Sequence, residues 1–301
     1  MKYTLIIIAV LGIAGISVAQ PASQAGTASA QFLKIGIGAR PIGMGGAYTA
    51  LSSDANSMYW NPAGLTGFNG TQVSVMHNKW FQGINYEFLG IAYADSNESA
   101  FAFGLSFLWM DDISVTTFSD PLGASGNTFT ARDLSFVFSY GHQFTQYLSL
   151  GASVKRIRSE IAEKSATTTA FDAGAKLSTP LRGLTLGATI QNIGSGLKFV
   201  TESDKLPLIY KFGAAFTYLD MATISVDIGK PIDNRFRVNA GGEFVLLDVL
   251  ALRAGYNSAN ELDRGMTGGA GIKFQRIGLD YAFVPYGVLG NSHRFSASYR
   301  F

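Results

Sequence analysis

The feature that most constrains this chain is a two-residue period, in which large apolar side chains alternate with small or charged ones. From Phe101 to Trp109 every second residue is large and apolar, and Ala102, Gly104 and Ser106 fall between them. Successive side chains of a β-strand point to opposite faces, so this segment predicts a strand with one apolar and one small face. The pattern recurs to the C-terminus, and charged residues repeatedly take the small face.

Charges on the small face decide between two kinds of β-protein. A soluble sandwich would have to bury them in its core, whereas a membrane barrel turns them to a polar lumen and shows the aromatic face to lipid. Only 15% of the residues are charged, against roughly 25% in soluble domains. No mature segment approaches the roughly 20 apolar residues of a membrane helix. We therefore expect an all-β fold, a transmembrane antiparallel β-barrel.

The alternation predicts about fourteen strands, with twelve to sixteen left open because boundaries shift by a few residues. They cover 71–77, 85–94, 98–110, 129–142, 147–157, 168–177, 184–192, 207–218, 222–229, 235–245, 249–257, 266–274, 277–284 and 293–301. Short links such as 219–221 and 275–276 alternate with longer ones, which lie at 78–84, 111–128, 158–167, 193–206, 230–234, 258–265 and 285–292. Short turns belong on the periplasmic side. On this assignment both termini and the glycine-rich segment begin at the periplasmic end.

That glycine-rich segment, Gly36 to Leu65, is the one long stretch of the mature chain without the alternation. Ser52 to Trp60 predicts a short helix, with Ser52 or Ser53 as N-cap and Asp54 in the first turn. Asn61 before Pro62 predicts another helical turn. We expect residues 36–66 to be a plug or periplasmic lid between a flexible lead-in at 20–35 and the barrel at 67–301. Its plug or hinge motif consists of Gly43, Gly45, Gly46, Asn61, Pro62 and Gly64.

Residues 1–19 are predicted to be a secretory signal peptide, with Lys2 before an apolar stretch and Ser17-Val18-Ala19 as the cleavage site. Removal of Lys2 from the 23 basic residues leaves 22 against 21 acidic ones, a balance that indicates no nucleic-acid partner. The chain has no cysteine, hence no disulfide framework or thiol chemistry. Export of a cysteine-free β-protein favours the outer membrane of a Gram-negative-type bacterium, with its lipid as a partner.

Both ends of the mature chain resemble the PorV/PorQ family, which is related to the fatty-acid channel FadL. The N-terminal resemblance lies in residues 39–65, above all in Asn61-Pro62-Ala63-Gly64-Leu65, which also fits FadL-like channels. The C-terminal one lies in Leu279 to Phe301, which is similar to the closing hairpin of that family. Intermediate pieces at 187–194 and 227–233 also look like it, so the resemblance covers essentially the whole mature chain.

The resemblance implies a fourteen-stranded outer-membrane barrel that assists type IX secretion, with exported proteins or secretion-system components as partners. It also implies that the terminal aromatics Tyr299 and Phe301 are presented to the barrel-assembly machinery. The leading hypothesis is thus a non-enzymatic accessory of protein export and surface attachment. The alternative is a FadL-like channel for uptake of hydrophobic small molecules, which would meet the plug and leave through the wall. A purely structural barrel is a third hypothesis.

Sequence motifs give no indication of catalysis, a metal or a cofactor. The three histidines, His77, His142 and His293, lack paired metal spacing, and no nucleophile elbow is present. The lumen charges form either a salt-bridge lattice or a path for a solute; they are Lys155, Asp172, Lys176, Lys211, Asp227, Arg237, Glu243, Arg253, Lys273 and Asp280. The outer-loop aromatics Trp80 and Phe81 form either a membrane-interface girdle or a contact for a partner or hydrophobic ligand.

Overall fold

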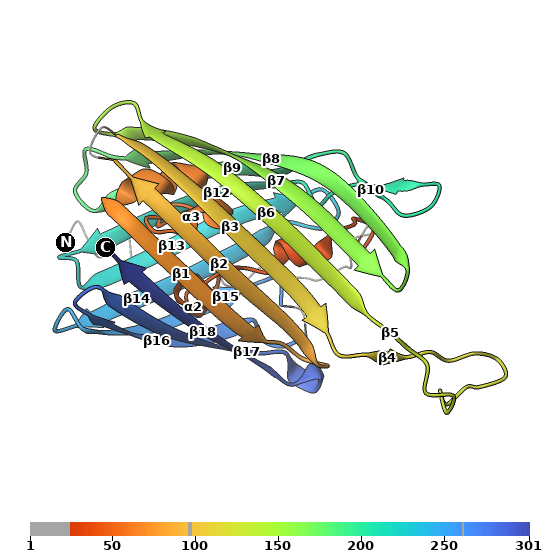
Figure 1. Ribbon diagram of the computed structural model, residues 1–301. Coiled ribbons are helices and arrows are strands. Elements are labelled where there is room, and N and C mark those ends of the chain that lie inside the picture. The colour runs from red at the N-terminus through yellow and green to blue at the C-terminus, as the bar shows by residue number, and fades with distance from the viewer. Residues whose placement is uncertain (1–24, 96–97, 261) are drawn as a thin grey trace.

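The computed structural model describes residues 25–95, 98–260 and 262–301, so the predicted signal peptide lies outside the described residues. Fourteen strands form one closed antiparallel barrel, which confirms the predicted fold (Figure 1). They are β1 (Gly70–Lys79), β2 (Ile84–Ala94), β3 (Ser99–Met110), β6 (Ala131–Gln143), β7 (Leu148–Ile161), β8 (Lys164–Ser178), β9 (Leu184–Gly194), β12 (Ile209–Tyr218), β13 (Ala222–Pro231), β14 (Arg237–Leu246), β15 (Leu250–Asn257), β16 (Met266–Phe274), β17 (Ile277–Pro285) and β18 (Asn291–Arg300).

Two short hairpins extend from the loops at one end of the barrel, which we call the long-loop end (Figure 1). One pairs β4 (Ile113–Ser114) with β5 (Thr128–Phe129), and the other pairs β10 (Leu197–Lys198) with β11 (Ser203–Asp204). The opposite, tight-turn end carries the short links 219–221 and 275–276 and the C-terminus.

The outer wall is apolar. Phe103, Phe212 and Ile272 lie within strands and are still more than half exposed. A wall of this kind matches the lipid-facing band of a membrane barrel. Among the described residues, no helix is long and apolar enough to cross a bilayer.

The loop predicted at 158–167 is wrong. β7 continues to Ile161 and β8 begins at Lys164, so only Ala162 and Glu163 connect them. Ala162 has a φ of 52°, as the central residues of a two-residue hairpin turn require. Ser159 and its partner Ala166 are buried, and they extend the strand pairing beyond the predicted boundaries.

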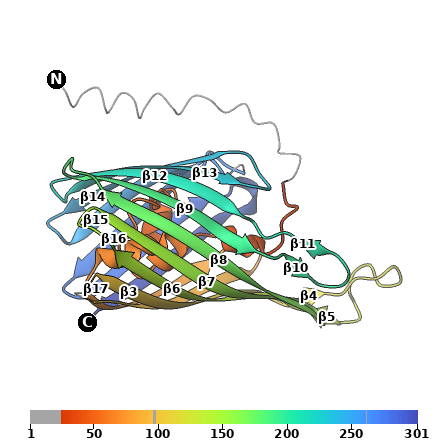
Figure 2. The same cartoon turned by 90° about the horizontal axis from the view of Figure 1, so that it is seen from above.

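Residues 36–66, here called the inner segment, lie inside the barrel (Figure 2). The segment contains α2 (Ala39–Gly43), α3 (Ser57–Trp60) and most of η3 (Pro62–Gly67), and η2 (Gln31–Lys34) precedes it. The helix predicted from Ser52 is wrong, since α3 begins only at Ser57 and has no side-chain cap. The turn predicted after Asn61 is confirmed, because the Asn61 side chain accepts a hydrogen bond from the Ala63 amide and Pro62 opens η3.

The inner segment crosses the lumen from end to end. Before it, the Ser29 amide donates to the Lys205 carbonyl at 2.9 Å, and Lys34 pairs with Asp233. Both partners lie in loops at the long-loop end. The prediction that the glycine-rich segment begins at the same end as the C-terminus is therefore wrong. It begins at the long-loop end and runs toward the tight-turn end, where β1 starts.

Glycines of the barrel wall let the inner segment touch it. A Cβ at Gly151 or Gly174 would collide with the backbone of Pro62 or with Asn61, and one at Gly241 would collide with the Met44 carbonyl. Several of these glycines are cross-strand partners, as with Gly151 and Gly174. We call the set the wall glycines: Gly104, Gly141, Gly151, Gly174, Gly187, Gly213, Gly241, Gly255 and Gly269. At these positions the wall and the inner segment are in direct contact.

Candidate functional site

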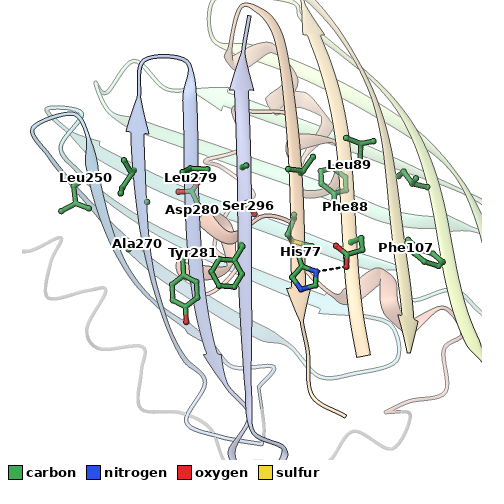
Figure 3. A pocket seen from close by; sticks show the side chains of 18 residues that line it. His77, Phe88, Leu89, Phe107, Leu250, Ala270, Leu279, Asp280, Tyr281 and Ser296 are labelled. Carbon is green, nitrogen blue, oxygen red and sulfur yellow. Dashed lines mark hydrogen bonds and ion pairs between the residues drawn. The ribbon is translucent and has the colours of Figure 1, made fainter. Parts of the chain in front are cut away.

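The barrel has a hollow on its outer wall and a pocket inside its lumen. The outer hollow, of about 700 Å³, extends across strands β15 to β18 and β1 to β3 (Figure 3). It contains one polar pair, His77 Nδ1 with Glu87 Oε1 at 2.8 Å, among apolar side chains such as Leu89, Phe107 and Leu279. Since these side chains belong to the lipid-facing wall, the hollow is a surface for lipid and is not part of the lumen.

The inner pocket lies in the lumen at the long-loop end, between the inner segment and the wall, and has a volume of about 340 Å³. Four aromatic residues line it: Tyr59, Trp60, Trp80 and Tyr286. Its aliphatic lining includes Ile42, Ile209 and Val284. Ten of its 24 lining residues are polar or charged. A concave pocket that combines apolar surface with polar groups is the usual form of a small-molecule site.

The pocket aromatics are held in place. The Trp60 indole donates to the Ile37 carbonyl at 2.8 Å, and the Tyr59 hydroxyl donates to the Leu33 carbonyl at 3.0 Å. Their rings meet edge to face, with centroids 5.0 Å apart. The pocket is therefore bordered by rings whose orientation is fixed before any ligand arrives.

Trp80 and Phe81, for which two roles were predicted, lie against Tyr286. The Trp80 and Phe81 rings are 4.5 Å apart, and the Tyr286 ring lies 6.1 and 5.2 Å from them. Trp80 lines the pocket and also packs against the core. This placement favours the ligand-contact role for Trp80 over a place in a lipid-facing girdle.

Three of the predicted lumen charges join one network with the inner segment. Arg253 contacts Glu243 at 2.6 Å and Asp280 at 2.7 Å, and Arg40 binds the same Glu243 carboxylate. The network continues through Tyr48, which receives a hydrogen bond from Arg40 and donates one to Asp54. Burial raises the pKa of Tyr48 well above its usual value, so the hydroxyl stays protonated and can donate.

The other predicted charges have separate places. Lys155 pairs with Asp172 at 2.6 Å, and Lys176 donates to the Ser52 carbonyl. Lys211, Asp227 and Arg237 line the inner pocket, whereas Lys273 is exposed near the tight-turn end. In the part of the chain that the structure describes, no group of three or more His, Asp or Glu could hold a metal ion.

The predicted plug motif fastens the inner segment. Asn61 donates to the carbonyls of Thr49 and Ala175, at 2.9 and 3.0 Å, and so joins the segment to β8. Gly45 and Gly46 both have positive φ, of 67° and 79°, where a side chain would be strained. Gly43 and Gly64 approach Gly269 and Ser52 too closely for a larger residue. Pro62 opens η3, as described above.

Sequence reasoning did not single out several residues that matter here, namely Arg40, Tyr59, Trp60, Tyr286 and Arg294. The available signal was weak: Tyr59 and Trp60 are large aromatics in a stretch without strand periodicity, directly before Asn61. Arg294 takes the small face of β18, yet its place in the pocket depends on the path of the inner segment, which the alternation does not encode.

Solved structures with this fold include channels and transporters. The chain matches the CymD monoaromatic hydrocarbon channel with a TM-score of 0.63 at 14% identity, over 89% of this chain and 98% of that one. It matches the Pseudomonas putida toluene transporter TodX with a TM-score of 0.62 at 15% identity, over 88% of this chain and 97% of that one. It matches a Pseudomonas aeruginosa FadL homologue with a TM-score of 0.57 at 14% identity, over 94% of this chain and 99% of that one. At these identities the likeness shows the fold.

No curated protein matches the sequence. The resemblance to PorV/PorQ is not confirmed, because neither the solved structures nor the family model carries that name. The family model that matches is described as "Uncharacterised protein family (UPF0164)" and covers residues 8–178, more than half of the 301 residues. The chain belongs to the UPF0164 family.

Proposed function

We propose that the protein is a non-enzymatic outer-membrane channel for small hydrophobic molecules, and that residues 36–66 are its plug. The observation that carries the proposal is the inner pocket, in which Tyr59, Trp60 and Trp80 face a space of about 340 Å³ beside the plug. Such a pocket suits a ring-sized apolar ligand. The fold shared with channels whose names refer to toluene and monoaromatic hydrocarbons supports it.

The proposal favours the second hypothesis of the sequence over the first, since the solved structures named above are channels and transporters. In this reading the long-loop end faces outward and the tight-turn end faces the periplasm, as in barrels of this class. A ligand enters between the long loops, reaches the pocket above the plug and moves on after a local rearrangement. The close contacts at the wall glycines prevent the plug from leaving the lumen as one rigid unit.

Uptake of a labelled ring-sized compound, [¹⁴C]toluene, tests the proposal in cells lacking the gene and complemented with variants. Gly229 lines the pocket, and a Cβ there would make only ordinary contacts, the nearest at 3.6 Å with Lys211 Cγ. Gly229→Leu therefore fills the pocket without strain and should slow uptake toward the level of the deletion. The matched control is Gly268→Leu, since a Cβ at Gly268 meets nothing within 4 Å.

Equal uptake by the deletion and wild-type cells would reject the proposal. Proteins released by the same cells provide the test of the export hypothesis. We expect the released set to be unchanged by the deletion, and accumulation of exported proteins in the periplasm would favour the export role instead.

A further inference from the structure

We infer that the ligand of the inner pocket is a ring-sized carboxylate, bound by Lys211 and Arg294. This inference rests on the proposed function and narrows it from apolar molecules in general to those with one anionic group. It starts from the charges that line the pocket, which among the described residues are Lys34, Lys211, Asp227, Arg237 and Arg294. Four are basic and one is acidic, so the pocket lining carries an excess of basic residues.

The single acid of the pocket is largely committed to the plug. Asp227 Oδ2 accepts hydrogen bonds from the amides of Tyr48 and Thr49, at 3.0 and 2.9 Å. A carboxylate used in this way orders the plug backbone and offers only its other oxygen to the pocket. Lys34 has its own partner, Asp233, at the pocket's edge.

Lys211 lines the pocket and is attracted by Asp227 without forming an ion pair with it. Its ammonium lies 5.2 Å from the Trp60 ring centroid and 5.8 Å from the Tyr59 ring centroid. In the described chain, no carboxylate comes within ion-pair distance of it, Asp227 included. The two rings give it cation–π contacts, which are weaker than a charge-assisted hydrogen bond to a carboxylate.

Arg294 is a second cation that lines the inner pocket. It is 2% exposed, and its Nε is buried without a hydrogen-bond partner. Its Nη1 donates to the Gly36 carbonyl, and its guanidinium also interacts with the Tyr286 hydroxyl. No described carboxylate forms an ion pair with it. Lys211 lies over the Tyr59 ring, and Arg294 lines the same pocket.

A neutral hydrocarbon would displace water from Lys211 and Arg294 and give neither cation an anion at hydrogen-bond distance, which is costly for buried charges. A carboxylate would accept hydrogen bonds from both, while its ring packs on Tyr59 and Trp60. The arrangement therefore discriminates against the neutral analogue, as sites with unpaired buried polar groups do.

Tryptophan fluorescence of the purified full-length barrel in detergent provides a direct test, because Trp60 and Trp80 line the pocket. The third tryptophan, Trp109, lies in β3 outside it, so Trp109→Phe removes the background. The probes are benzoate, its neutral isostere benzamide, and toluene. We expect benzoate to bind at least tenfold more tightly than benzamide, and Lys211→Met to abolish this preference.

Lys273→Met is the matched control, because that lysine lies outside the pocket, and it should keep the full preference. Arg294→Met should also lose the preference for benzoate over benzamide. If that variant does not fold, the Lys211→Met variant alone tests the inference. Equal affinity for benzoate and benzamide, or a Lys211→Met variant with unchanged benzoate affinity, would overturn the inference. Binding of toluene alone would overturn it and leave the proposed channel function standing. Binding of none of the three probes would overturn both.

Discussion

Arg40 of the inner segment and Glu243 of β14 form a two-point ion pair, with Nε to Oε2 at 2.9 Å and Nη2 to Oε1 at 2.7 Å. Arg253 of β15 binds the same carboxylate at 2.6 Å. Glu243 is therefore a buried anion between two arginines, one from the wall and one from the lumen. This arrangement supports the lattice interpretation of the lumen charges, since it fastens the inner segment to the barrel.

Loss of the Glu243 charge should weaken the barrel. Glu243→Gln leaves Arg40 without its anion and Arg253 with Asp280 alone, and breaking a buried pair costs about 3–5 kcal/mol. We expect the temperature at which the compact, unboiled form unfolds on a gel to fall. The matched control is Glu160→Gln, which removes an exposed partner of Arg158 at 3.3 Å and should change stability by no more than about 1 kcal/mol. Equal shifts for both variants would contradict the lattice.

A methyl group at a wall glycine should prevent proper seating of the inner segment. Gly151→Ala places a Cβ against the Pro62–Ala63 backbone, which cannot shift as a side chain tip can. We expect a cost at or above the upper part of the roughly 1–3 kcal/mol typical of overpacking, visible as a lower yield of heat-modifiable barrel. Gly268→Ala adds the same methyl group where nothing lies within 4 Å, and its yield should match wild type.

Asn61→Ala should destabilise the contact between the inner segment and β8. The substitution removes two donors and leaves the carbonyls of Thr49 and Ala175 buried without their partner. An unsatisfied buried polar group costs about 1–3 kcal/mol, so thermal unfolding followed by circular dichroism should shift well below wild type. Asn85→Ala loses one exposed bond to the Gly83 carbonyl and should leave the transition in place.

The contact between η2 and the loop after β13 should depend on pH. Burial opposes ionisation of Asp233, but hydrogen bonds from Lys34 and Gln31 outweigh it and hold the pKa of Asp233 below its usual value. Because the pKa is lowered in the folded state, the stabilisation is complete above the unfolded pKa of about 3.9. It is lost as the pH falls from there through the folded pKa.

Since the chain has no cysteine, a dye on Ser29→Cys can report release of this contact. We expect its emission to change as the pH falls below about 4. With Asp233→Asn the emission should resemble the acid form already at pH 7. A wild-type signal that stays flat down to pH 3 would contradict this prediction.

The sequence predicts the barrel well because the alternation of side chains is local. A single strand such as β3 or β12 shows by its own residues which side chains lie on each face. The cross-strand partners Glu243 and Arg253 can also be expected from adjacent predicted strands. The Arg40–Glu243 pair cannot, because 203 residues separate them and the inner segment has no period to fix its path. For the same reason the sequence does not predict the inner pocket, because its walls come from the inner segment and from several strands at once.

The wall glycines also have a consequence for biogenesis. The inner segment leads almost directly into the first strand, since η3 ends at Gly67 and β1 begins at Gly70. β1 pairs with β18, so the barrel closes next to the strand that the inner segment leads into. Because the wall glycines contact the inner segment directly, residues 36–66 cannot enter a finished cylinder. The strands must therefore assemble around them, and the segment serves as an internal template whose folding and membrane insertion form a single step.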